Sequence, residues 1–173
     1  MNGDTDVYHV VIQDVRFSSD EDFEMLQQAL LDMRRPSDAE DAACYFYAYC
    51  LTPGCAHLLL RERRWKVAEV VEHLSGFCYD DDDVKYDCEP CFDANRFLVL
   101  LTFVHQTPVR EGLTDHPGEY GYSSWTNDYL ALGAPRICDT RAVIRRYGFD
   151  AINEKLQTPL DKCAACLDYL PFA

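Results

Sequence analysis

The chain has 173 residues and a formal net charge of −14, with 48% hydrophobic and 13% aromatic residues. This length fits one domain with its own core, and the hydrophobic content excludes a disordered chain. No apolar run approaches the roughly 18 residues that span a bilayer, and the polar, acidic N-terminus excludes a signal peptide. We therefore expect a cytoplasmic protein that does not enter a membrane.

The first half of the chain alternates between strand and helix patterns. Residues 7–13 alternate apolar and polar positions as a strand does, and residues 20–34 keep helical spacing after an acidic first turn. Residues 43–51 and 55–60, separated by a proline–glycine turn, are expected to form two paired strands. A second helix is expected over about residues 66–77, which place their valines on one side.

The second half of the chain shows mainly helical patterns. Residues 78–92 are acidic and predict an irregular loop. Asp93 is a suitable N-cap for a helix that runs to about Gln106, and Pro108 is expected to end it.

The C-terminal part predicts shorter helices. Residues 123–132 indicate a short helix that ends at a glycine. Residues 139–170 indicate two or three more, divided by Gly148 and Pro159. This order of elements predicts an α+β fold with antiparallel strands.

The segment over residues 49–60, Tyr-Cys-Leu-Thr-Pro-Gly-Cys-Ala-His-Leu-Leu-Leu, is the most informative part of the chain. Side chains alternate along a strand, so its second strand places Cys55 and His57 on one face. The segment resembles the signature of the single-tyrosine HUH transposases, which include the REP-associated tyrosine transposases. In that family the same position holds a His-x-His pair.

Other segments resemble that family in the same order, namely residues 8–11, 19–23, 100–113 and 117–125. Pro-Val-Arg-x-Gly-Leu and Tyr-x-x-Ser-Ser-Trp are the most specific of these matches. The resemblance covers roughly residues 7–132. It implies a ferredoxin-like or RRM-like antiparallel sheet with helices packed on one face and the site on the other. We expect an HUH transposase-like domain over residues 1–133, with a helical extension over residues 134–173 packed on it.

The resemblance also implies a chemistry and a site. Such enzymes cleave single-stranded DNA through a phosphotyrosine intermediate, with Mg²⁺ or Mn²⁺ held by two histidines and by an amide four residues after the tyrosine. It places the tyrosine at Phe103, the first histidine at Cys55 and the amide at Thr107. Only His57 is retained. Phenylalanine has no nucleophilic oxygen, and cysteine and threonine are poor ligands for Mg²⁺. We expect no cofactor and no cleavage.

The expected partner is single-stranded or hairpin DNA, bound as a monomer or a homodimer. Candidate phosphate contacts follow the second strand of the signature, at Arg61, Arg63, Arg64 and Lys66. A second basic group comprises Arg141, Arg145 and Arg146. The overall charge of −14 and the acidic residues 79–88 oppose this binding. A charge run is also compatible with a merely solvated face.

Nine cysteines are many for a chain of this length. In a reducing compartment they are thiols or metal ligands. Cys88 and Cys91, and again Cys163 and Cys166, have the spacing of zinc knuckles. The two pairs are about 70 residues apart, wider than in ordinary zinc ribbons, and ordinary thiols are the simpler interpretation.

Three functions follow from these observations. The first is a transposase-like module that binds DNA but does not cut it. The second is an active enzyme whose nucleophile has moved, for example to Tyr79 or Tyr86. The third is a protein-interaction domain that no longer binds DNA and holds zinc at the cysteine pairs.

Overall fold

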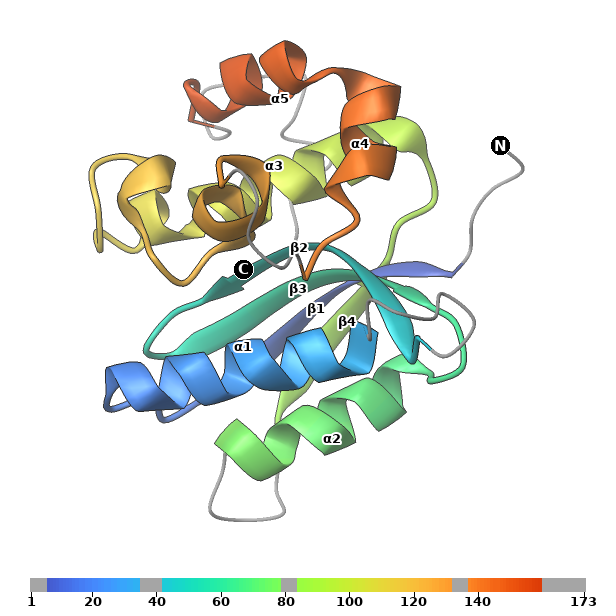
Figure 1. Cartoon of the computed structure of the whole chain (residues 1–173), viewed down its shortest axis with the longest axis vertical. Coiled ribbons are helices and arrows are strands. Elements are labelled where there is room, and N and C mark those ends of the chain that lie inside the picture. The colour runs from blue at the N-terminus through green and yellow to red at the C-terminus, as the bar shows by residue number, and fades with distance from the viewer. Residues whose placement is uncertain (1–5, 35–41, 79–83, 132–136, 160–173) are drawn as a thin grey trace.

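The structure is a computed structural model that describes residues 6–34, 42–78, 84–131 and 137–159. Within these residues the strands are β1 Val7–Gln13, β2 Cys44–Leu51, β3 Cys55–Glu62 and β4 Tyr86–Pro90. The helices are α1 Asp20–Arg34, α2 Val67–Cys78, α3 Ala94–Arg110, α4 Thr140–Tyr147 and α5 Phe149–Leu156. Two short turns complete them, η1 Pro117–Glu119 and the π-helical η2 Trp125–Tyr129. The four strands form one antiparallel sheet in the order β2-β3-β1-β4 (Figure 1).

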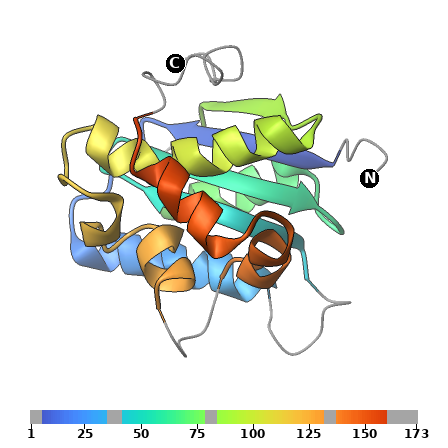
Figure 2. The same ribbon diagram turned by 90° about the horizontal axis from the view of Figure 1, so that it is seen from above.

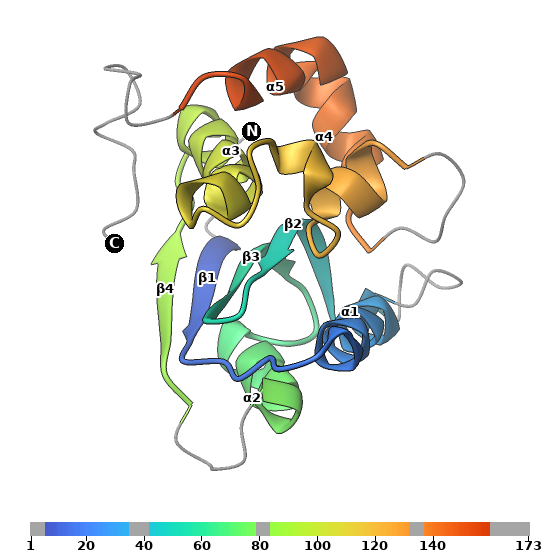
Figure 3. The same cartoon turned by 90° about the vertical axis from the view of Figure 1, so that its left-hand side faces the viewer.

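Helices cover both faces of this sheet. On one face, Leu26 and Leu30 of α1 and Val70 of α2 share a buried apolar cluster with inward side chains of the strands. On the other face, α3 packs against the sheet, and η2, α4 and α5 pack around α3 (Figure 3). The α+β antiparallel fold is confirmed. The expectation of helices on one face holds for α1 and α2 only, because the apolar side of α3 covers the second face.

Alternation along the strands assigns each side chain to a face. In β1, Val10 and Ile12 face α1 and α2, whereas Val7 faces α3. A bulge between Phe46 and Ala48 changes this alternation in β2, so that Phe46 and Tyr49 face the same side. The sheet therefore has an apolar layer on each face, and polar side chains occupy only some of the positions in these layers.

Helix α3 lies lengthwise over the sheet, with α5 beside it (Figure 2). It begins at Asp93, whose carboxylate accepts hydrogen bonds from the N–H groups of Asn95 and Arg96 at 2.8 and 2.9 Å. The prediction that Pro108 ends this helix was wrong, because α3 continues to Arg110. A proline in the last turn removes only one backbone donor, and the carbonyl of Pro108 still accepts from the N–H of Leu113 at 2.8 Å.

The loop predicted over residues 78–92 contains β4 instead, which was missed. Its residues pair with β1 from Tyr8 opposite Pro90 to Ile12 opposite Tyr86. Three of its five positions are exposed, so the strand lacks the apolar alternation that reveals a buried strand. As an edge strand it has one neighbour, and this pairing stabilises it without a hydrophobic side of its own.

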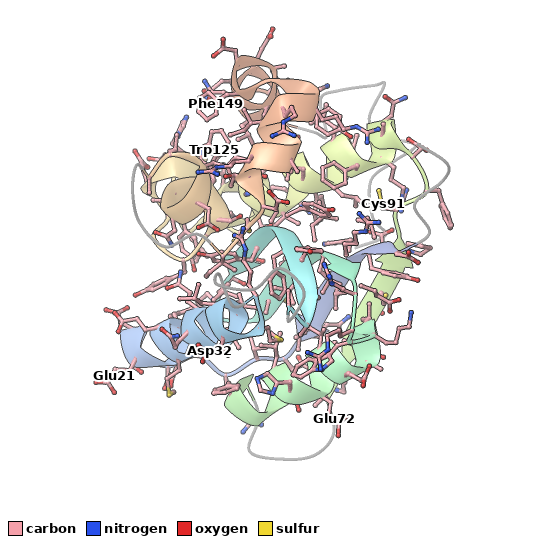
Figure 4. All side chains as sticks on the ribbon, turned by 45° about the vertical axis from the view of Figure 1, so that its right-hand side comes forward. Glu21, Asp32, Glu72, Cys91, Trp125 and Phe149 are labelled. Carbon is pink, nitrogen blue, oxygen red and sulfur yellow. The ribbon has the colours of Figure 1, made fainter. Side chains whose placement is uncertain are left out.

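The C-terminal helices join the core of the α3 side. Trp125 stacks on Phe149 with the ring centroids 5.6 Å apart (Figure 4). Ile152 and Leu156 of α5 belong to the same buried cluster as Val104 of α3. The predicted separation of these helices at Gly148 is confirmed, and Gly148 has a φ of 79° that favours glycine. The domain boundary at residue 133 stays a prediction.

Among the described residues, no helix has the length and apolar character needed to cross a bilayer.

Candidate functional site

The positions carried over from the transposase signature converge on one cleft. Cys55 and His57 on β3, together with Phe103 and Thr107 on α3, line a hollow of about 890 Å³. The strand alternation brings the first pair to the α3 face, and the i, i+4 spacing brings the second pair to one side of the helix. The ring centroids of His57 and Phe103 are 6.0 Å apart. The convergence expected from the sequence is therefore present.

His57 is enclosed by other rings. Its Nδ1 lies 3.5 Å from Nε2 of His9, and the two imidazoles stack with centroids 5.7 Å apart. Phe103 meets His9 edge-on at 5.6 Å. Burial, with the nearby positive charges of His9 and Arg110, lowers the pKa of His57 to about 3. His57 is therefore neutral at physiological pH.

Behind His57 lies a polar chain that sequence reasoning missed. His9 Nδ1 is 2.8 Å from a carboxylate oxygen of Glu89, and the other oxygen accepts from Arg96. Burial works to raise the pKa of Glu89, but the hydrogen bond to His9 and the charges of His9 and Arg96 lower it overall. The available signal was His9 itself, a buried polar residue between Val7 and Val11 on the α3 face of β1.

Phe103 fills the position that the resemblance assigns to the nucleophile. Its ring is 6% exposed, and the guanidinium carbon of Arg110 lies 3.8 Å above the ring centroid. This is a close cation–π contact, one turn of helix α3 beyond Thr107. Phe103 therefore forms packing between two histidines and an arginine, and presents no oxygen to the cleft.

The residues at the metal-binding positions do not fit Mg²⁺ or Mn²⁺. Burial, with the charges of Glu111 and Asp14, raises the pKa of Cys55, so its thiol stays protonated. The hydroxyl of Thr107 donates to the carbonyl of Phe103 at 3.0 Å, inside its own helix. Both metals prefer oxygen ligands, chiefly carboxylates, and no three His, Cys, Asp or Glu side chains in the described part of the chain are grouped to hold an ion.

The rim of the cleft is acidic. Its lining includes the carboxylates of Asp14, Asp87, Glu89 and Glu111, against the single guanidinium of Arg110. Lys85 pairs with Asp14 at 3.2 Å, and the side-chain amide of Gln13 donates to Asp87. The remaining negative charge repels a phosphate at this position.

The basic cluster lies elsewhere. Arg61 lies within β3, four residues after His57, whereas Arg63, Arg64 and Lys66 follow the end of the strand. Arg63 is six residues, or roughly 20 Å at the rise of a strand, beyond His57. Several of them already have partners. Arg63 donates to the hydroxyl of Tyr45, and Lys66 pairs with Glu62 at 2.9 Å.

The second basic group lies toward the same end. Cys138 forms an isolated β-bridge with Phe46 of β2, and Phe46 pairs with Leu60 near the end of β3. Helix α4 begins two residues after Cys138 (Figure 1). The arginines of α4 are exposed, namely Arg141, Arg145 and Arg146. The start of α4 therefore lies toward the end of the sheet that Arg63 follows.

The cysteine and tyrosine alternatives are placed differently. Cys88 lies opposite Val10, on the α2 face of β4, whereas Cys91 is buried in the core under α3. The two residues therefore lie on opposite faces of the sheet. Cys163, Cys166 and Tyr79 lie outside the described residues. Tyr86 lies opposite Ile12, so its side chain is on the face away from His57.

Comparison with known proteins points to the fold alone. No protein-family model matches this chain, and none of the curated proteins matches it. A solved structure of a REP-associated tyrosine transposase bound to a REP hairpin is similar, with a TM-score of 0.56 and 12% sequence identity. The likeness covers 75% of this chain and 82% of the transposase chain. The chain therefore has the fold of a REP-associated tyrosine transposase, as its sequence motifs predicted.

Proposed function

We propose that this protein is a DNA-binding module with a transposase fold that binds single-stranded or hairpin DNA without cutting it. The observation that carries the proposal is Phe103, which lies 6.0 Å from the retained His57 in the fold of a hairpin-binding transposase. A phosphotyrosine intermediate needs an oxygen at this position, and the aromatic ring supplies none. The neighbouring Cys55 and Thr107 do not replace the missing chemistry.

DNA is proposed to meet the basic end of the sheet, and not the cleft. The exposed residues there are Arg63, Arg64 and Lys66, with Arg141 and Arg145 of α4 nearby. Phosphate contacts need such cations, whereas four carboxylates surround the cleft. Binding is expected to be weak and to fall steeply with salt, because the net charge of −14 opposes association.

The test uses a fluorescent DNA hairpin with a single-stranded tail, and a random single-stranded oligonucleotide. We expect a gel shift at about 50 mM salt, where phosphate contacts are strong, and no covalent adduct on a denaturing gel with Mg²⁺ or Mn²⁺. The variant Phe103→Tyr is the matched control, and it should also form no adduct because Cys55 and Thr107 remain. A covalent adduct with the wild-type chain contradicts the loss of cleavage.

A second candidate is a protein-interaction domain that does not bind DNA. The acidic cleft favours it, since Asp14, Asp87 and Glu111 are placed where a DNA phosphate is otherwise expected. Failure of both DNA probes to bind at about 50 mM salt would select this candidate. Zinc at the cysteine pairs, which belongs to the same hypothesis, is checked by measuring metal content after purification without chelator.

A further inference from the structure

The two edges of the sheet differ in how the rest of the described chain covers them. Outward backbone groups of β2 are covered by the segment that follows α3. The carbonyl of Tyr122 accepts from Leu51 N–H at 2.9 Å, and the hydroxyl of Ser124 bonds to both the N–H and the carbonyl of Tyr49. Asp139 N–H donates to the carbonyl of Phe46 at 2.8 Å. The β2 edge is therefore closed to further strands.

The β4 edge is open among the described residues. Gln13 N–H donates to the carbonyl of Lys85, and Cys91 N–H donates to the carbonyl of Val7. In this antiparallel register, Asp87 and Glu89 bond to β1, whereas the backbone groups of Tyr86 and Cys88 point outward. No described residue supplies a partner for the outward N–H and carbonyl of Cys88. Such a row is a template for a further strand.

The side chains along this edge specify the chemistry of that strand. Asp87 and Glu89 project to the cleft face, beside Asp14 and Glu111. Tyr86, which is 40% exposed, and Cys88 project to the opposite face. A strand added here places every second side chain beside a carboxylate and the alternate ones beside Tyr86 and Cys88. Opposite charges paired across strands stabilise the pairing, and like charges destabilise it.

We propose that the β4 edge binds an extended segment of another protein in which lysine or arginine alternates with apolar residues. This inference does not depend on DNA binding. A second copy fits poorly, because the symmetric pairing about Cys88 places Asp87 opposite Glu89 of the other chain. It also places Tyr86 opposite Pro90, which has no N–H. DNA is disfavoured at this edge by the carboxylates beside it.

The test uses the full chain and a labelled, end-capped heptapeptide, Thr-Lys-Val-Lys-Val-Lys-Thr. We expect saturable binding by fluorescence anisotropy, and slower amide hydrogen exchange at Tyr86 and Cys88. One control peptide carries glutamate in place of lysine and tests charge. A second is N-methylated at alternate amides and keeps the charge, but it cannot pair as a strand. Both should fail to bind.

Two variants of the chain locate the site. Cys88→Pro removes the outward N–H and leaves the bonds to β1, since proline is tolerated on edge strands. It should weaken binding by roughly three- to tenfold, which corresponds to one hydrogen bond. Asp87→Asn keeps an acceptor for Gln13 and should weaken binding by a few fold. Glu72→Gln, the same charge change on α2, should have no effect (Figure 4).

Three outcomes contradict the proposal. Equal binding of the N-methylated peptide would show charge attraction alone. No binding of the lysine peptide, with the chain folded by circular dichroism, would show that the edge is closed. If sedimentation shows dimers that the Cys88→Pro variant no longer forms, a second copy of the chain occupies the edge. If Cys88→Pro fails to fold, Asp87→Asn and the exchange measurement still decide between these outcomes.

Discussion

The two ends of β3 carry opposite chemistry. At its start, Cys55 and His57 face a cleft where four carboxylates surround one guanidinium and the aromatic rings are packed together. At its other end, Arg63, Arg64 and Lys66 are exposed. The first is the cleft end of β3 and the second is its basic end. One end holds the four positions carried over from the transposase signature in a packed, acidic cleft, and the other end holds exposed cations.

This difference separates two properties that a DNA-cutting enzyme combines. Cleavage needs the phosphate, the nucleophile and the metal at one point. In this chain the exposed cations lie at one end of the sheet, roughly 20 Å from the positions that the family resemblance assigns to the reactive site. Under the proposed function, this separation would let the protein hold DNA and leave it intact.

The largest expected effect concerns acid, which should destabilise the fold through two buried histidines, His57 in the cleft and His105 outside it, whose ring packs on Trp125 and Tyr129. Burial lowers the pKa of both His57 and His105 to about 3 in the folded chain, from 6.5 in the unfolded chain. Between these values the unfolded chain binds the protons and the folded chain does not, so stability falls as pH falls. From about pH 7 to about pH 5 we expect a loss of about 2 kcal/mol for each histidine.

Urea unfolding at several pH values measures this loss. His57→Asn should remove about half of the pH dependence in this range, because one of the two titrating groups is gone. At the basic end, Arg63→Gln should leave the pH dependence unchanged, since arginine does not titrate there. A flat stability profile between about pH 7 and pH 5 would contradict the buried, neutral state of both histidines.

The second prediction concerns the packing of Phe103. Phe103→Ala should lower the free energy of unfolding by about 3 kcal/mol, because the ring is 6% exposed and contacts His9, His57 and Arg110. Phe103→Leu should cost under about 1.5 kcal/mol, since most of the volume is kept. A cost below about 1 kcal/mol for alanine would mean that the ring is not part of the packing, which would leave the site open.

The third prediction concerns where DNA binds. Reversal of both Arg63 and Arg64 to glutamate should weaken binding at least roughly thirtyfold at about 50 mM salt, or about 2 kcal/mol, because attraction to phosphates becomes repulsion. Arg110→Glu, a reversal at the cleft end, should change the affinity by less than about threefold. The reverse pattern in gel shifts would place the DNA in the cleft and overturn the separation of the two ends.

Local signals in the sequence predicted much of the fold and of the cleft. The bounds of β1 and α1 agree with the structure, because strand alternation and an acidic helix start depend on neighbouring residues. Spacing within one strand and one helix pairs Cys55 with His57 and Phe103 with Thr107, and the family resemblance predicted that the two pairs meet in one site. What was missed depends on residues far apart in the chain.

The contact between His9 and Glu89 joins positions 80 residues apart, and no local pattern encodes it. It exists because β4 pairs with β1, and β4 itself was missed for want of an apolar side. The separation of the basic cluster from the cleft was missed for a different reason. Arg63 follows His57 closely in sequence, but an extended strand converts six residues into roughly 20 Å.

The smallest expected effect concerns Lys66, whose charge is already partnered at the basic end. Its ammonium pairs with Glu62 at 2.9 Å, and the lysine side chain is 69% exposed. Exposed ion pairs contribute little, so Lys66→Met should leave the midpoint of urea unfolding almost unchanged. DNA affinity should fall only about two- to threefold at about 50 mM salt, because Glu62 already offsets part of the positive charge. Lys66→Met in the background of Glu62→Gln should lose more affinity, since the lysine is then released toward the phosphates. Gel shifts with the two single variants and the double variant complete a double-mutant cycle for this ion pair. An additive result would show that Glu62 does not compete with DNA for this lysine.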